Sequence, residues 1–253
     1  MKLDLLALSG IVLGVATIVA GNLLEGGSVG MLLDTPAALI VLGGTLGAVI
    51  LQTPAAELRR AVRLARRAFT PASTDRDQIL RRIEQASRQY RQKGAISLEA
   101  LAQNERDEFV RNALELVAME REPAHIRAAL ELDLSKRVET DVSAAAVYRA
   151  MGGYAPTIGI LGAVIGLIQV MSHLEDPSQL GPGIATAFVA TIYGVGLANL
   201  LLLPLAERLR RLVEREADLK ALWIDGLLAM VEGEHPSTLR LRIGEGKTLG
   251  CFE

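Results

Sequence analysis

Four long stretches without a charged residue constrain the fold of this chain more than any other feature. They are 20, 22, 25 and 30 residues long and cover residues 5–24, 35–56, 150–174 and 177–206. A helix needs about 20 mostly apolar residues to cross the hydrocarbon core of a bilayer. The sequence therefore predicts an all-α integral membrane protein with four transmembrane helices. Four buried helices of a water-soluble protein are the alternative, which these lengths disfavour.

Composition excludes several other classes of protein. Half of the residues are hydrophobic, which is too many for a disordered chain. The single cysteine, Cys251, has no partner for a disulfide within the chain, and the three histidines show no metal-ligand spacing. The net charge of -2 gives no reason to expect nucleic acid as a partner. We therefore expect no cofactor, no metal site and no bound nucleic acid.

The basic residues all lie on one side of the predicted spans. One precedes the first span, eighteen lie between the second and third, and eight follow the fourth. The connections at residues 25–34 and 175–176 contain none. Because Lys and Arg favour the cytoplasmic ends of membrane helices, we expect both termini and the long loop in the cytoplasm. Five arginines follow the second span directly: Arg59, Arg60, Arg63, Arg66 and Arg67.

The spans divide the chain into four expected parts. Residues 1–54 and 150–206 are each a transmembrane hairpin, residues 55–149 are a cytoplasmic helical domain, and residues 207–253 are a cytoplasmic amphipathic tail. No glycine or proline interrupts residues 125–150. The third span is therefore expected to be the continuation of a cytoplasmic helix, and the fourth is expected to continue into the charged tail.

Three helices are predicted within the long loop. Thr74 or Asp75 can cap a first helix whose apolar residues recur at spacings of four, three and four, and Gly94 ends it. A second helical stretch covers residues 98–117. Pro123 suits the first turn of a third helix, because proline there loses no helical hydrogen bond.

The spans lack a feature that most ion-transporting proteins have. No Asp, Glu, Lys or Arg lies inside any of them, whereas ion and proton relays usually keep an ionisable residue at membrane depth. Either another protein supplies that residue, or the chain is a passive scaffold. Polar groups such as Thr157, Thr186, Thr191 and Tyr193 remain. A hydroxyl in a helix most often bonds to the carbonyl one turn earlier.

Small residues are frequent in the second, third and fourth spans. Two pairs of glycines are separated by three residues, a spacing that lets helix backbones approach closely. The pattern does not distinguish packing between chains from packing within one chain. The glycines expected to pack helices are Gly43, Gly47, Gly159, Gly162, Gly166 and Gly194.

Two prolines interrupt the third and fourth spans. A proline inside a helix leaves a carbonyl without its usual donor and bends the axis. Pro156 lies seven residues before Ala163, so the two share a helix face, and Pro204 lies near the end of the fourth span. Beside a smooth face of small residues at 187–198, a bent helix could form the wall of an ion pathway. A static bend explains the sequence equally well.

At these residues the sequence resembles the MotA/PomA family, the A subunit of the bacterial flagellar stator. The similar segments in the spans are APTIGILGAVIGL at 155–167, ATIYG at 190–194 and LPLA at 203–206. RQKGAISLE at 91–99 resembles the rotor-facing segment of the family's cytoplasmic loop. The resemblance covers essentially the whole chain and agrees with a layout of four spans with a large loop between the second and third.

The resemblance implies partners and a location. Family members lie in the bacterial inner membrane, where five A subunits surround two B subunits of the MotB/PomB type. Each B subunit carries an ion-binding aspartate on its single transmembrane helix, which would supply the missing carboxylate. Ion flow, worth about 2.3 kcal/mol per charge per 100 mV, drives torque on the rotor protein FliG. No cofactor is implied.

The resemblance also implies roles for individual residues. Pro156 and Pro204 match the two prolines that couple ion binding to motion, and Thr191 matches the channel-facing threonine of the fourth span. Arg91 and Glu99 match the charged pair that engages FliG. Without the resemblance, an ordinary solvated face would be the simpler interpretation of those two charges.

Ala163 bears on the coupling ion. Sodium-driven members resemble each other in having threonine at this position, whereas proton-driven members have alanine. An alanine lacks the oxygen that a dehydrated sodium ion could use as a ligand. We therefore expect proton coupling, although the unseen B subunit also shapes the path.

Two alternatives to a proton-channelling stator stay open. One is an ion-driven energiser of a non-flagellar process, such as gliding or export, in the wider MotA/TolQ/ExbB superfamily, and the other is a passive membrane scaffold. An enzyme is not expected, because the sequence contains no nucleophile–base pair or metal cluster.

Overall fold

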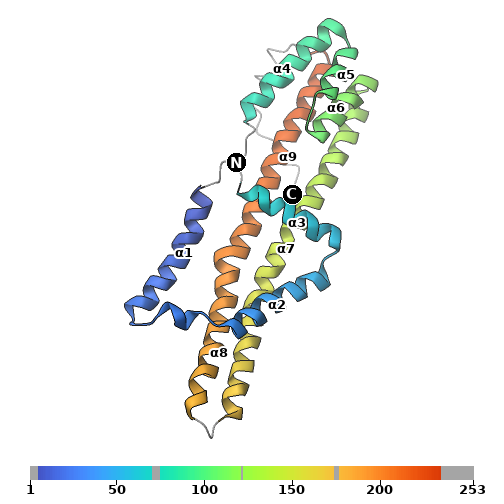
Figure 1. The fold of residues 1–253 in the computed structure, drawn as a ribbon. Coiled ribbons are helices and arrows are strands. Elements are labelled where there is room, and N and C mark those ends of the chain that lie inside the picture. The colour runs from blue at the N-terminus through green and yellow to red at the C-terminus, as the bar shows by residue number, and fades with distance from the viewer. Residues whose placement is uncertain (1–4, 70–74, 121, 174–176, 235–253) are drawn as a thin grey trace. The chain divides into compact units, whose positions relative to one another are not determined.

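The structure, a computed structural model, describes residues 5–69, 75–120, 122–173 and 177–234. The described residues form helices and their connections, and no strand occurs among them (Figure 1). In chain order the elements are α1 (Leu5–Leu24), the 3-10 turn η1 (Val29–Leu32), α2 (Thr35–Gln52), α3 (Ala55–Ala68), α4 (Arg76–Lys93), α5 (Ile96–Gln103), α6 (Glu108–Met119), α7 (Pro123–Ser172), α8 (Pro177–Leu197), the π-turn η2 (Ala198–Leu202) and α9 (Leu203–Val231).

The all-α prediction is therefore confirmed in its coarse form. Three helical segments are long and apolar enough to cross a membrane, namely Val29–Gln52, Pro123–Ser172 and Leu180–Val231. α1 is a shorter apolar helix over Leu8–Leu24 by the same measure. Large apolar side chains on the outer faces of these helices stay exposed, such as Leu13, Leu51 and Phe188. Apolar side chains exposed in such number suit lipid or other membrane helices rather than water.

Most of the predicted helix boundaries in the loop are confirmed. α4 begins after Asp75 and ends at Gly94, whose φ of 69° is easily reached by glycine. α7 begins at Pro123 and continues for 50 residues, so the third span and the last loop helix are one helix. Thr74, the other proposed cap, lies outside the described residues.

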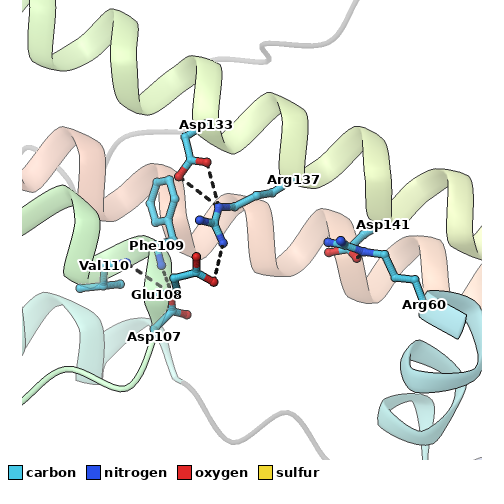
Figure 2. A network of polar contacts seen from close by, with 8 residues as sticks. All are labelled: Arg60, Asp107, Glu108, Phe109, Val110, Asp133, Arg137 and Asp141. Atoms are coloured by element: carbon cyan, nitrogen blue, oxygen red, sulfur yellow. Dashed lines mark hydrogen bonds and ion pairs between the residues drawn. The ribbon is translucent and has the colours of Figure 1, made fainter. Parts of the chain in front are cut away.

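One predicted helix is wrong. The stretch at 98–117 is two helices, α5 and α6, rather than one. The side chain of Asp107 accepts hydrogen bonds from the backbone N–H groups of Phe109 and Val110, at 2.9 and 3.3 Å (Figure 2). Asp107 is therefore the N-cap of α6, and its own backbone is extended rather than helical. This extended residue separates α6 from α5.

The chain divides into two compact units. Unit 1 consists of residues 1–71 and 141–211, and unit 2 consists of residues 72–140 and 212–253. α7 and α9 contribute residues to both units.

Unit 1 is built on close packing of α2, α7 and α8. α2 begins at a cap from Asp34, whose Oδ1 accepts from the Ala37 N–H at 2.7 Å. It is buried at every fourth residue, at Ala37, Val41, Thr45 and Val49. α2 ends where Pro54 follows Thr53, because the residue before a proline is disfavoured in the helical conformation.

Unit 2 has an ordinary apolar core. Helices α4, α5 and α6 pack with residues of α7 and α9 around fully buried side chains such as Leu98, Phe109, Ile126 and Leu227. Each fully buried side chain of this size stabilises the fold by about 1.5–3 kcal/mol. This unit is therefore a helical bundle with an apolar core of its own.

Charge pairs on α7 join helices of unit 2. Arg137 is bound by Asp133 at 3.0 Å and by Glu108 of α6 at 3.5 Å (Figure 2). Burial lowers the pKa of Arg137, but the hydrogen bonds and charges of Asp133 and Glu108 outweigh burial and raise the pKa above its ordinary value. The guanidinium is therefore charged at every pH that a cell meets.

Candidate functional site

The two prolines occupy different backbone settings. Pro156 lies inside α7, which stays helical on both sides, and its side chain is half-buried. Pro204 is the second residue of α9, which follows the π-turn directly. In that turn the Leu203 N–H donates to the Ala198 carbonyl, five residues earlier. The backbone bonding thus shifts by one residue just before a proline, which has no N–H to donate.

The glycines of α7 and α8 form a backbone-to-backbone seam within the chain. A Cβ atom added at Gly194 would lie 2.5 Å from the Ala155 carbonyl oxygen and 3.0 Å from the Gly159 Cα. A Cβ atom at Gly159 would lie 2.8 Å from the Ala190 carbonyl oxygen. Real Cβ contacts are essentially never shorter than 3.0 Å. These positions therefore need glycine for the two helices to lie this close.

The same seam continues one and two turns further along α7. A Cβ atom at Gly162 would lie 2.8 Å from the Ala190 Cβ, and one at Gly166 would lie 2.9 Å from the Gly183 carbonyl oxygen. Gly159, Gly162, Gly166 and Gly194 therefore pack helices within one chain. This resolves, for these four, the choice that the sequence pattern left open.

Gly43 and Gly47 on α2 differ from the seam glycines. A Cβ atom added at either would have no heavy atom within 4 Å, and both are exposed. Gly44, between them, is the close-packed one, since its Cβ would lie 2.7 Å from a methyl group of Ile158. The Gly43–Gly47 face therefore packs against nothing in the described part of this chain, and a role in packing between chains stays a prediction.

Thr191 and Ala163 are both half-buried. The Thr191 hydroxyl donates to the Ala187 carbonyl of its own helix at 3.3 Å, and the Thr157 hydroxyl donates to the Tyr154 carbonyl at 2.8 Å. Both are the local bonds that helix geometry favours. Any contact of Thr191 with an ion or a partner stays a prediction.

A polar cluster that sequence reasoning missed joins the α1–α2 connection to α8. The Thr186 hydroxyl donates to Asp34 Oδ2 at 2.7 Å, and the Tyr193 hydroxyl donates to the Leu32 carbonyl at 2.6 Å. The Asp34 N–H in turn donates to the Tyr193 hydroxyl at 3.2 Å. Thr186 and Tyr193 lie seven residues apart, about two helical turns, so they share one face of α8. That spacing indicates a shared polar face on α8, but it does not indicate the partner residues of that face.

The two predicted rotor-facing charges lie in unit 2, and both are exposed. Arg91, in the last turn of α4, donates from Nη2 to the Gly233 carbonyl at the end of α9, at 3.0 Å. Glu99 lies in the first turn of α5, where a negative charge is favoured by the helix dipole. Arg91 therefore has a structural contact besides any role at a surface.

Metal chemistry has no evident site here. Among the residues that the structure describes, no group of three His, Cys, Asp or Glu side chains could hold a metal ion. The spans of unit 1 offer hydroxyls, backbone carbonyls and close helix packing instead. The charge-free stretches of this unit contain no carboxylate.

Comparisons with known proteins identify relatives along nearly the whole chain. Residues 101–221 match the MotA/TolQ/ExbB proton channel family, and residues 8–94 match the Motility protein A N-terminal family. The chain is 30% identical to chemotaxis protein PomA of Vibrio alginolyticus over 249 residues, which are 97% of each protein. It is 30% identical to motility protein A of Bacillus subtilis over 242 residues, 95% of this chain and 90% of that protein.

Solved structures share the fold. The structure of MotAB from C. jejuni gives a TM-score of 0.88 at 23% identity and covers 98% of this chain and 100% of that chain. The flagellar MotAB stator complex from Bacillus subtilis gives a TM-score of 0.84 at 30% identity, covering 93% of this chain and 92% of that chain. By identity and coverage together, the chain belongs to the motility protein A family of flagellar stator subunits, within the MotA/TolQ/ExbB proton channel proteins.

Proposed function

We propose that the chain is the A subunit of a flagellar stator, which converts ion flow across the inner membrane into torque on the rotor. The observation that carries the proposal is the combination of apolar helices with no charged residue and relatives that are stator A subunits over nearly their whole length. A stator needs an ion-binding carboxylate at membrane depth. This chain offers none, so a B subunit of the MotB/PomB type supplies it.

The finer architecture is part of the same proposal. α1 crosses the membrane in addition to the three long apolar segments, which makes four transmembrane helices. Both termini lie in the cytoplasm, and five copies of the chain surround two B subunits. The one-sided distribution of basic residues supports the orientation. The exposed apolar faces of the membrane helices and the exposed Gly43–Gly47 face support contacts with further helices and lipid.

Proton coupling is proposed from Ala163, which offers no hydroxyl ligand for sodium. The test is swimming of a stator-deficient strain that expresses this chain with the B subunit encoded beside it. Swimming should stop when a protonophore collapses the proton gradient and should be indifferent to external sodium. Swimming that requires sodium and survives the protonophore would contradict proton coupling while leaving the stator role intact.

The rotor surface is proposed at Arg91 and Glu99. Reversing Arg91 to Glu should reduce swimming strongly, and reversing Glu99 to Lys should do the same, because each variant places a like charge opposite its partner on FliG. Arg88→Glu is the matched control, because Arg88 lies on the same helix and its side chain is 70% exposed. Its ion pair with Glu84 is long, at 4.0 Å. Unaffected swimming of the Arg91 variant, with intact assembly, would contradict the rotor role.

A further inference from the structure

α3 is the most strongly charged helix next to a predicted span. Its 14 residues, AAELRRAVRLARRA, contain five arginines and one glutamate. The proposed function uses none of them. Positive charge beside a membrane helix agrees with the cytoplasmic orientation, but orientation alone does not require the charges to lie on one face of a helix.

One face of α3 is fixed to the rest of unit 1. Ala61, Leu64 and Ala68 are buried, at 1%, 4% and 3% exposure. Three polar contacts hold the same helix to α7 and α9. They are the ion pair of Arg60 with Asp141 at 2.6 Å (Figure 2), the hydrogen bond from the Tyr148 hydroxyl to the Ala61 carbonyl at 3.1 Å, and the hydrogen bond from Arg208 Nε to the Ala68 carbonyl at 2.8 Å.

The opposite face of α3 carries three arginines. At about 100° per residue, Arg59, Arg63 and Arg66 fall within roughly 60° of one another, directly opposite the face that is buried. All three are exposed. Because α3 is anchored through its other face, its backbone places these three exposed side chains on the same side of the helix. The Arg59 Nε also donates to the Ala55 carbonyl of its own helix at 3.3 Å.

The anchors also give the depth of α3 relative to the bilayer. Tyr148 lies two residues before the charge-free stretch 150–174, and Arg208 lies two residues after the charge-free stretch 177–206. α2 itself is 18 residues long, about 27 Å at 1.5 Å per residue, which is close to the roughly 30 Å thickness of the hydrocarbon core. α3 begins only three residues after α2 ends. Three independent connections thus hold α3 at headgroup level.

We propose that the face formed by Arg59, Arg63 and Arg66 binds the phosphates of anionic phospholipid headgroups. The guanidinium group forms paired hydrogen bonds with phosphate oxygens. Clustered arginines on an amphipathic helix beside a membrane span are the usual basis of attraction to anionic lipids. The occupant is a lipid rather than a protein, because the cluster lies at the depth of the headgroups and its charge is complementary to theirs.

The test measures lipid preference of the purified full-length chain. Delipidated protein in neutral detergent is titrated with phosphatidylglycerol or phosphatidylcholine, and bound lipids are counted by native mass spectrometry. An attraction of about 1 kcal/mol per arginine corresponds to about a five-fold change in affinity. The double variant Arg59→Gln, Arg63→Gln should therefore lose about 25-fold of its affinity for phosphatidylglycerol and little of its affinity for phosphatidylcholine.

Two further variants keep the result interpretable. Arg81→Gln with Arg88→Gln removes two exposed arginines from α4 in unit 2 and should leave the lipid preference within two-fold of wild type. Arg59→Lys with Arg63→Lys keeps the charge and should keep most of the preference. Higher salt should weaken the wild-type preference, because exposed charges are screened.

Three results would overturn the proposal. They are a wild-type chain with no preference for phosphatidylglycerol, a glutamine variant within two-fold of wild type, and a control variant that loses as much affinity as the α3 variant. The readout does not depend on swimming. A chain that drives no flagellum could therefore still bind these lipids, and a working stator could fail this test.

Discussion

Gly194→Ala tests whether the α7–α8 seam is the main packing constraint of unit 1. The new Cβ would lie 2.5 Å from the Ala155 carbonyl oxygen, a backbone atom that cannot rotate away. Ordinary van der Waals contact begins at 3.4 Å, so the two helices would have to separate by about 0.9 Å. Gly159, whose Cα would be 3.0 Å from the same Cβ, would lose its close contact in the process.

The magnitude follows from two opposing effects. Replacing a helical glycine by alanine stabilises a helix by about 0.5–1 kcal/mol. Overpacking a closely packed contact costs about 1–3 kcal/mol. Gly196→Ala is the matched control, because Gly196 lies two residues away on α8 and a Cβ there has no heavy atom within 4 Å. The control should gain only the stabilisation that alanine gives a helix over glycine. The free energies of unfolding of the two variants should therefore differ by about 1–3 kcal/mol.

The assay is thermal unfolding of the purified chain in detergent, followed by the helical circular dichroism signal. Gly196→Ala should unfold at or above the wild-type temperature, and Gly194→Ala should unfold below it. The double variant Gly159→Ala, Gly194→Ala should cost less than the sum of the single variants, because one separation of the helices accommodates both methyl groups. A Gly194 variant as stable as the Gly196 variant would refute the seam as a constraint.

Two further predictions concern the α1–α2 connection and the π-turn. In a double-mutant cycle, Asp34→Ala and Thr186→Val should couple by about 1.5–3 kcal/mol, the range for hydrogen bonds to a charged group. Additive single effects in chemical unfolding would contradict the contact. Pro204→Ala should change the unfolding temperature little, since proline is tolerated in the first turn of a helix, while lowering swimming speed. Swimming at wild-type speed, with the B subunit still bound in pull-down, would contradict a coupling role for Pro204.

Local sequence signals predicted the ends of helices well. Gly94 and Pro123 act through backbone preferences within one helical turn, and the structure places a helix boundary at each. A boundary also lies at Asp75, but its side chain makes no capping hydrogen bond. The break between α5 and α6 has the same kind of signal, in the cap at Asp107. It was missed because the apolar residues on either side keep a nearly continuous helical period.

Contacts between residues distant in the chain had no such signal. The bond between Asp34 and Thr186 spans 152 positions, and that between Arg91 and Gly233 spans 142. Their partners are set by how helices pack, which a single sequence does not state. The glycine pattern predicted close packing, but only the structure shows that the α7 glycines face α8 of the same chain whereas Gly43 does not.

The closed seam limits where an ion can pass in the proposed stator. Backbone atoms of α7 and α8 meet from Gly159 to Gly166, which leaves no room for an ion between these two helices. Ala163 and Thr191 are half-buried beside this seam rather than sealed within it. In the proposed function the path therefore runs along the outer face of the α7–α8 pair, where the carboxylate of a B subunit can reach it. In the proposed stator, a chain whose spans carry no charge thus contributes a closely packed wall to the path, and its partner contributes the ion-binding group.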